Sequence, residues 1–130
     1  MTDEEFLEAF ARGRLARWEW THEAHVRMAF LYFTRFGQHE ALAKISAGIQ
    51  HYNNLRGNPT GYHETITVAF CRLVASRLPG SGDWQAFRLE NPDLLARDVL
   101  ERHYSRDLLF SSKAKAEFVA PDRDLLPLNP

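Results

Sequence analysis

Hydrophobic side chains recur at helical spacing along most of the chain. This periodicity predicts helices over residues 3–12, 22–36, 38–53, 62–78 and 92–104, with a short helical segment over 83–87. The final stretch, 105–130, contains Pro121, Pro127 and Pro130 and predicts an extended tail laid over the helices. The pattern as a whole predicts an all-α fold, an up-down bundle of four to five helices in a single domain spanning residues 1–130.

Residues that start or stop helices support these boundaries. Favourable N-terminal residues precede the predicted helices, namely Thr2 with its capping-box partner Glu5, Thr21, Thr60 or Gly61, Asp83, and Asn91-Pro92. Gly13 and Gly37 end the first two helices. The segments 56–61 and 79–82 are rich in glycine and proline, so both predict turns.

The segment between the first two helices is aromatic and basic. Its tryptophans, Trp18 and Trp20, are expected to cover the end of the bundle rather than face water. Arg12, Arg14 and Arg17 form a modest basic cluster. This cluster could attract an anionic substrate, or it could simply be a solvated face of the protein.

Composition and charge narrow the classes of protein. The chain has 130 residues, of which 45% are hydrophobic and 25% charged, and its formal net charge is -1. An even charge balance disfavours a nucleic-acid partner, and no apolar run is long enough to suggest a membrane span. Cys71 is the one cysteine, which excludes an internal disulfide. Together with an acidic N-terminus unlike a signal peptide, it favours a cytoplasmic protein.

Two histidine motifs concentrate the chemistry of the sequence. The first is Trp20-Thr21-His22-Glu23-Ala24-His25, and the second is Tyr62-His63-Glu64-Thr65. Both lie at predicted helix starts. If the helices over 22–36, 38–53 and 62–78 run up, down and up, the first and third begin at the same end of the bundle. The topology then predicts that His22, His25 and His63 converge.

Three neutral imidazoles suit a divalent transition metal, most simply zinc or iron, and leave a coordination position for water. Glu64 or Glu23 could act as the general base for that water. The sequence therefore favours a metal-dependent enzyme, most simply a hydrolase acting on a small molecule. Two alternatives stay open: the histidines could serve acid/base chemistry without a metal, or they could have purely structural roles. Glutamates in a first turn also stabilise the helix dipole.

A second function of a different class stays open. The histidines and tryptophans could shape a pocket in a non-catalytic bundle that binds a small ligand or a partner, and an exposed apolar tail would then suggest a homodimer. Cys71 is expected to be a buried small hydrophobic residue. His103 could supply a fourth ligand or a proton donor, or it could equally well favour the helix C-terminus as a cation. His39 and His51 are expected at the surface.

The motifs resemble those of a family of small bacterial proteins of unassigned function. The likeness rests on Trp20-Thr21-His22-x-x-His25, the stretch 49–53, Tyr62-His63-Glu64-Thr65, Tyr104-Ser105 and the segment 110–122. It implies no activity. The DinB/YfiT-like metal-binding bundles also use three histidines on four helices, but their paired histidines are four residues apart and here they are three apart. Only the general idea of a histidine site transfers.

Overall fold

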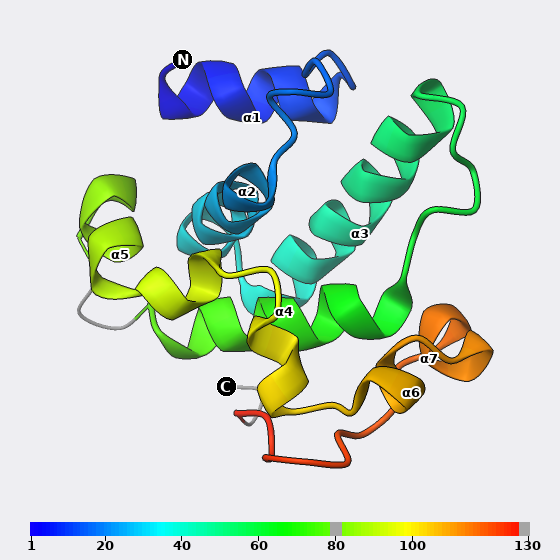
Figure 1. Ribbon diagram of the computed structural model, residues 1–130. Helices are drawn as coiled ribbons and strands as arrows, with labels where there is room; N and C mark the ends of the chain where they lie inside the picture. Colours follow the sequence, from blue (N-terminus) through cyan, green and yellow to red (C-terminus); the bar gives the residue numbers. More distant parts are fainter. Residues whose placement is uncertain (79–81, 128–130) are drawn as a thin grey trace. The chain divides into compact units, whose positions relative to one another are not determined.

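The structure is a computed structural model that describes residues 1–78 and 82–127. All regular secondary structure in these residues is helical, which confirms the all-α class (Figure 1). The chain divides into two compact units, Met1–Tyr62 and His63–Pro130, here called the N-terminal and C-terminal units. Each is described by itself, and the single-domain organisation stays a prediction. Most of the predicted turn at 79–82 lies outside the described residues.

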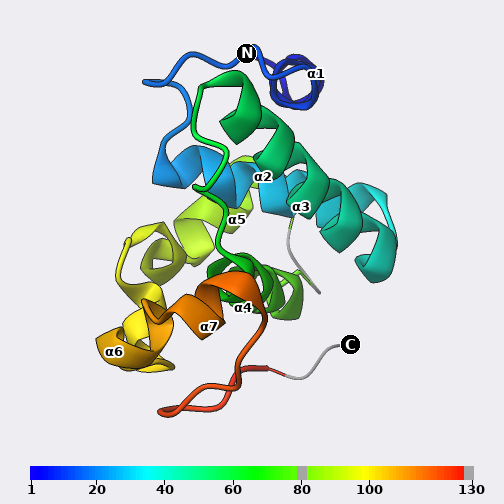
Figure 2. The ribbon, with the colours of Figure 1, turned by 90° about the vertical axis from the view of Figure 1, so that its right-hand side faces the viewer.

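The N-terminal unit is built from α1 (Asp3–Ala11), α2 (His22–Arg35) and α3 (Gln38–Leu55). These helices begin where the sequence predicts. Thr2 and Glu5 form the expected capping box, and the Thr21 hydroxyl accepts a hydrogen bond from the backbone N–H of Ala24 at 3.2 Å. After the short turn at Gly37, α3 runs back along α2 (Figure 2).

Two kinds of contact fasten α1 to the rest of this unit. Phe10 is fully buried, and its ring lies where a side chain on Gly48 would otherwise sit. Burial of such a ring contributes roughly 1.5–3 kcal/mol. On the outer side, Arg27 pairs with Asp3 at 2.8 Å and its guanidinium lies 4.7 Å from the centre of the Phe6 ring. These contacts hold α1 in place, and the connector (residues 12–21) begins where the positive φ of Gly13, 68°, turns the chain out of the helix.

The C-terminal unit begins with α4 (Glu64–Ser76) and continues through shorter elements. These are α5 (Trp84–Glu90), the 3-10 helices η1 (Pro92–Leu95) and η2 (Val99–Arg102), α6 (Arg106–Leu109) and α7 (Ser112–Ala116). Three of the short helices have side-chain caps, from Asp83, Ser105 and Ser111. The long helix α4 contacts both η2 and α7. No helix within the described ranges is at once long enough and apolar enough to cross a bilayer.

The predicted helix over 92–104 is wrong, because this segment forms the separate turns η1 and η2 with extended backbone at Ala96. Leu94 and Leu100 are both buried. A straight α-helix turns about 100° per residue, so it would point two positions six apart in very different directions. The break allows both leucines to face the core. Arg77 also holds η1 in place through hydrogen bonds to Asp93 at 2.6 and 2.8 Å.

The predicted extended tail over 105–130 is also partly wrong, since α6 and α7 lie within it. Residues 117–127 are not helical, and side chains of the same unit hold them. The buried Thr65 hydroxyl donates to the Glu117 carbonyl at 2.8 Å, and the Tyr104 hydroxyl donates to the Val119 carbonyl at 2.7 Å. Further along, Asp122 accepts hydrogen bonds from the backbone and hydroxyl of Ser105 at 2.7 and 2.6 Å.

Candidate functional site

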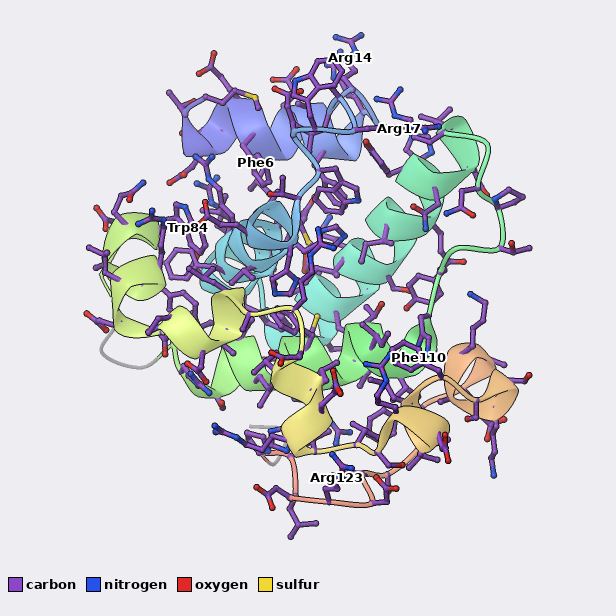
Figure 3. The ribbon with its side chains drawn as sticks, viewed as in Figure 1. Phe6, Arg14, Arg17, Trp84, Phe110 and Arg123 are labelled. Carbon is purple, nitrogen blue, oxygen red and sulfur yellow. The ribbon has the colours of Figure 1, made fainter. Side chains whose placement is uncertain are left out.

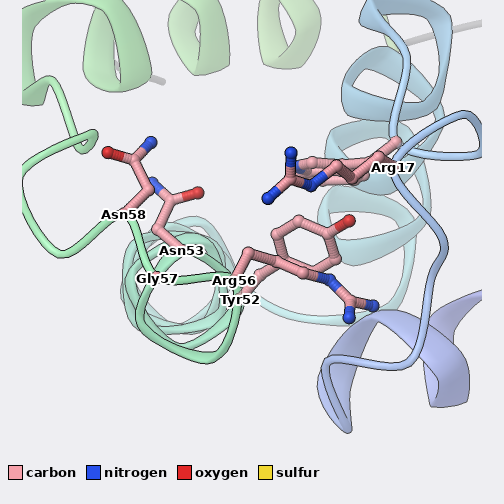
Figure 4. Close-up of a pocket in the computed structure, with 7 residues that line it drawn as sticks. Arg17, Tyr52, Asn53, Arg56, Gly57 and Asn58 are labelled. Carbon is pink, nitrogen blue, oxygen red and sulfur yellow. The ribbon is translucent and has the colours of Figure 1, made fainter.

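A pocket of about 450 Å³ opens in the N-terminal unit, where the connector meets the C-terminal end of α3 (Figure 4). This volume falls within the range of small-molecule sites, roughly 300–1,000 Å³. We call it the Arg17 pocket, and it is lined by Arg17, Trp20, Tyr52, Asn53, Arg56, Gly57 and Asn58. The lining contains two arginines and no carboxylate, so its charge favours an anion.

The connector is fastened to α3 by two side chains that meet the same carbonyl group. The Tyr52 hydroxyl donates to the Leu15 carbonyl at 2.9 Å, and the Arg56 guanidinium donates to that carbonyl as well. Arg56 also donates to the carbonyl of Gly13 at 3.1 Å and lies 5.0 Å from the centre of the Tyr52 ring. These bonds hold together the two segments, distant in sequence, that line the pocket.

Other rings pack against the aromatic residues of the lining, Trp20 and Tyr52. The Trp20 ring stacks on His25 at 3.8 Å and on Phe10 at 4.8 Å between centroids, and it lies 5.4 Å from Tyr52. Tyr52 is only 3% exposed. These contacts hold the Trp20 and Tyr52 rings in place as the floor of the pocket. Trp20 is half-buried, as the sequence predicts for a ring that does not face water.

Trp18 does not cover an end of the bundle, because its side chain is 83% exposed. A tight turn explains this outcome. The backbone N–H of Glu19 donates to the Ala16 carbonyl at 2.9 Å, and the Glu19 carboxylate accepts from the Ala16 N–H at 2.8 Å. This turn directs Leu15 inward and leaves Trp18 at its exposed tip.

The polar groups of the pocket come from both of its walls. Figure 4 shows the Arg17 guanidinium extending toward the side of the pocket that Asn53 and Asn58 line, with the Asn58 carboxamide lying farther from Arg17 than that of Asn53, while the Arg56 guanidinium points away from them. Arg17 and the neighbouring Arg14 both project from the connector (Figure 3). Arg17 is exposed and forms no ion pair with a carboxylate in the part of the chain that the structure describes.

The C-terminal end of α3 weakly disfavours an anion bound in the pocket. The C-terminus of an α-helix carries about half a negative charge, and α3 ends at Leu55 beside the pocket. Arg17 and Arg56 each carry a full positive charge. The two positive charges of the lining therefore outweigh the partial negative charge of the helix end.

The first histidine motif lies at the start of α2. His22 is the first residue of the helix and half-buried, and Glu23 is exposed. The Nδ1 atom of His25 lies 2.7 Å from the Thr21 carbonyl oxygen. A carbonyl only accepts, so Nδ1 carries the proton. Histidines that bind metals commonly donate their other ring N–H in this way.

The second motif differs from its prediction. His63 is the N-cap of α4 and does not lie in its first turn, because the helix begins at Glu64. The Nδ1 atom of His63 accepts from the backbone N–H of Ile66 at 3.1 Å, and Nε2–H donates to the Leu109 carbonyl at 2.7 Å. Both ring nitrogens are therefore bonded to backbone groups. A metal could bind His63 only if one of these bonds broke.

The predicted metal site draws on both units. His22 and His25 belong to the N-terminal unit, whereas His63 belongs to the C-terminal unit. Among the residues that the structure describes, no three or more His, Cys, Asp or Glu side chains are grouped to hold a metal ion. Convergence of the three histidines, with Glu23 or Glu64 as a base, stays a prediction.

The remaining candidates have local explanations. Cys71 is buried as predicted, and burial raises the pKa of its thiol to about 12, so it is a neutral thiol near pH 7. His103 is 8% exposed, and its Nδ1–H donates to the Asp124 carbonyl at 2.8 Å. His39 and His51 are exposed, as expected.

Comparisons of the chain with protein families, curated proteins and solved structures find no match. The resemblance to small bacterial proteins of unassigned function therefore stays a prediction.

Proposed function

We propose that the protein binds a small anionic ligand in the Arg17 pocket and does not act on it chemically. One observation carries this proposal: Arg17, Asn53 and Asn58 line one pocket whose lining contains no carboxylate. A guanidinium presents paired donors that match the geometry of a carboxylate or a phosphate. The carboxamides add neutral donors to the same space.

The expected affinity is modest because Arg17 is exposed to solvent. Exposed charge pairs contribute about 0.2–1 kcal/mol each, so the remaining affinity must come mainly from contact with the half-buried Trp20 ring. A probe such as phenyl phosphate has about eleven non-hydrogen atoms. At about 0.4 kcal/mol for each atom, its binding free energy is near 4 kcal/mol, which corresponds to a Kd of about 1 mM.

A titration with phenyl phosphate tests the proposal, because two neighbouring arginines provide a matched comparison. Arg17 lines the pocket, whereas Arg14 lies on the same exposed connector and does not line it. We expect Arg17→Gln to weaken binding about fivefold, the size of one favourable charge contact, and Arg14→Gln to leave it unchanged. Equal weakening by both variants would show that general surface charge attracts the probe, and it would overturn the proposal.

A metal-dependent hydrolase is the second candidate, and one observation favours it. The Nδ1–H of His25 donates to a backbone carbonyl, as metal-binding histidines commonly do. In this candidate His22, His25 and His63 hold zinc or iron, and Glu64 or Glu23 takes a proton from water. The two backbone hydrogen bonds of His63 weigh against it.

A further inference from the structure

The two asparagines of the Arg17 pocket are held in a fixed relation by the backbone. Asn53 lies in the last turn of α3, and Asn58 follows Gly57, whose positive φ of 73° reverses the chain. The backbone N–H of Asn58 donates to the carbonyl of Asn53 at 2.8 Å. This bond closes the loop and brings both carboxamides to one side of the pocket, opposite Arg17 (Figure 4).

A glycine makes room for one of these carboxamides. A Cβ placed on Gly61 would lie 2.1 Å from Nδ2 of Asn58. Any larger residue at position 61 would therefore push the carboxamide aside. The absence of a side chain at Gly61 thus permits the position that the Asn58 carboxamide takes, packed against the backbone of Gly61 while Asn58 lines the pocket.

We infer that the Arg17 pocket selects anions that also carry a planar edge with adjacent hydrogen-bond donor and acceptor groups, such as an adenine base or a primary carboxamide. This inference rests on the proposed anion binding and adds its specificity. A carboxamide side chain pairs with such an edge through two parallel hydrogen bonds, as asparagine does with adenine. Arg17 would hold the anionic group, while Asn53 and Asn58 would hold the edge.

Two matched pairs of probes test this specificity and separate its two chemical sources. AMP is compared with ribose 5-phosphate, which lacks the base, and succinamate with butyrate, which lacks the carboxamide. We expect the probe with the edge to bind about tenfold more tightly in at least one pair, the ratio given by two hydrogen bonds of ordinary net strength. The pair that shows the preference identifies whether the edge is a base or a carboxamide.

Variants assign that preference to the asparagines. Asn53→Leu, Asn58→Leu and Gly61→Ala should each reduce it severalfold while binding of the probe without an edge stays within about twofold. Asn54→Leu is the control, because Asn54 is exposed on the same helix end and does not line the pocket. Circular dichroism confirms that each variant is folded.

The outcomes distinguish this inference from the proposed function. Equal affinities within both pairs, or a preference that survives all three pocket variants, would overturn the specificity. If ribose 5-phosphate still bound and Arg17→Gln weakened it, the anion pocket itself would stand. If none of the four anions bound, both proposals would fail.

Discussion

The Nε2 atom of His63 lies 2.7 Å from the carbonyl oxygen of Leu109, so one imidazole joins the start of α4 to the end of α6. The same ring caps α4 through its Nδ1 atom. Two residues further on, the Thr65 hydroxyl bonds to both Glu117 and Val119. The motif that most suggested a metal ligand is thus used to tie the C-terminal segment to α4.

Replacing His63 with alanine is expected to destabilise the protein by about 2 kcal/mol. Loss of an N-cap costs about 0.5–2 kcal/mol, and loss of the bond to Leu109 adds about 1 kcal/mol. Asparagine is a good N-cap but is too short to reach Leu109. His63→Asn should therefore cost only about half as much, as measured by urea unfolding. Equal losses in the two variants would contradict the capping role.

Acidification should destabilise the C-terminal unit through the same ring. Burial lowers the pKa of His63 from the ordinary value of 6.5, the Leu109 carbonyl opposes this change, and Lys115 adds to the lowering. The unfolded chain therefore takes up a proton at a higher pH than the folded chain. The stabilisation is complete above the unfolded pKa and is lost as the pH falls towards the folded pKa.

Urea unfolding at about pH 7.5 and about pH 5 measures this effect, since the two values bracket the ordinary histidine pKa. The wild-type protein should lose more stability on acidification than His63→Asn. His39→Gln serves as the control because His39 is exposed, and it should follow the wild type. Parallel losses in wild type and His63→Asn would show that other groups govern the acid response.

Gly48→Ala should destabilise the N-terminal unit although alanine is the better helix former. A Cβ at this position would lie 2.6 Å from Cε2 of the buried Phe10 ring. Overpacking costs about 1–3 kcal/mol, whereas helix propensity returns about 1 kcal/mol, so we expect a net loss near 1 kcal/mol. In a Phe10→Leu background the same change should cost less or stabilise. A stabilised Gly48→Ala single variant in thermal unfolding would rule out the close contact.

Local signals in the sequence predicted much of the helical structure. Thr2 with Glu5, Thr21 and Asp83 cap their helices as expected, because a capping side chain bonds to backbone only a few residues away. The start of α4 was predicted two residues early. A histidine is an uncommon cap, and the role of His63 depends on Leu109, 46 residues further along the chain.

Features that depend on long-range packing were not predicted. The segment 92–104 has helical periodicity, yet burying both Leu94 and Leu100 breaks it into turns. The Arg17 pocket was missed for a similar reason, since Arg17 was noted only as part of a basic cluster. Asn53 and Asn58, which line the same pocket, lie about forty residues away. The two segments are joined by hydrogen bonds from side chains of α3 and its C-cap to backbone carbonyl groups of the connector, and sequence patterns do not show such bonds.

Metal analysis of untagged protein decides between the two candidate functions. A three-histidine site predicts about one zinc or iron per chain, lost in His25→Ala and in His63→Ala. Because both ring nitrogens of His63 are bonded to backbone, we expect no stoichiometric metal and no stabilisation by added zinc. Stoichiometric metal that disappears in both variants would favour the hydrolase instead.

The most direct test of the Arg17 pocket is to locate the bound anion by an NMR titration with phenyl phosphate. The indole N–H signals of the three tryptophans report where the probe binds. Trp20 lines the pocket, Trp18 is 83% exposed on the connector, and Trp84 belongs to the C-terminal unit. We expect the Trp20 signal to shift, with half of the change reached at about 1 mM probe, the Kd estimated for it, and little change at Trp84. Arg17→Gln but not Arg14→Gln should move this midpoint to an about fivefold higher concentration. A Trp20 signal that stays fixed while the probe binds elsewhere would contradict anion binding at Arg17.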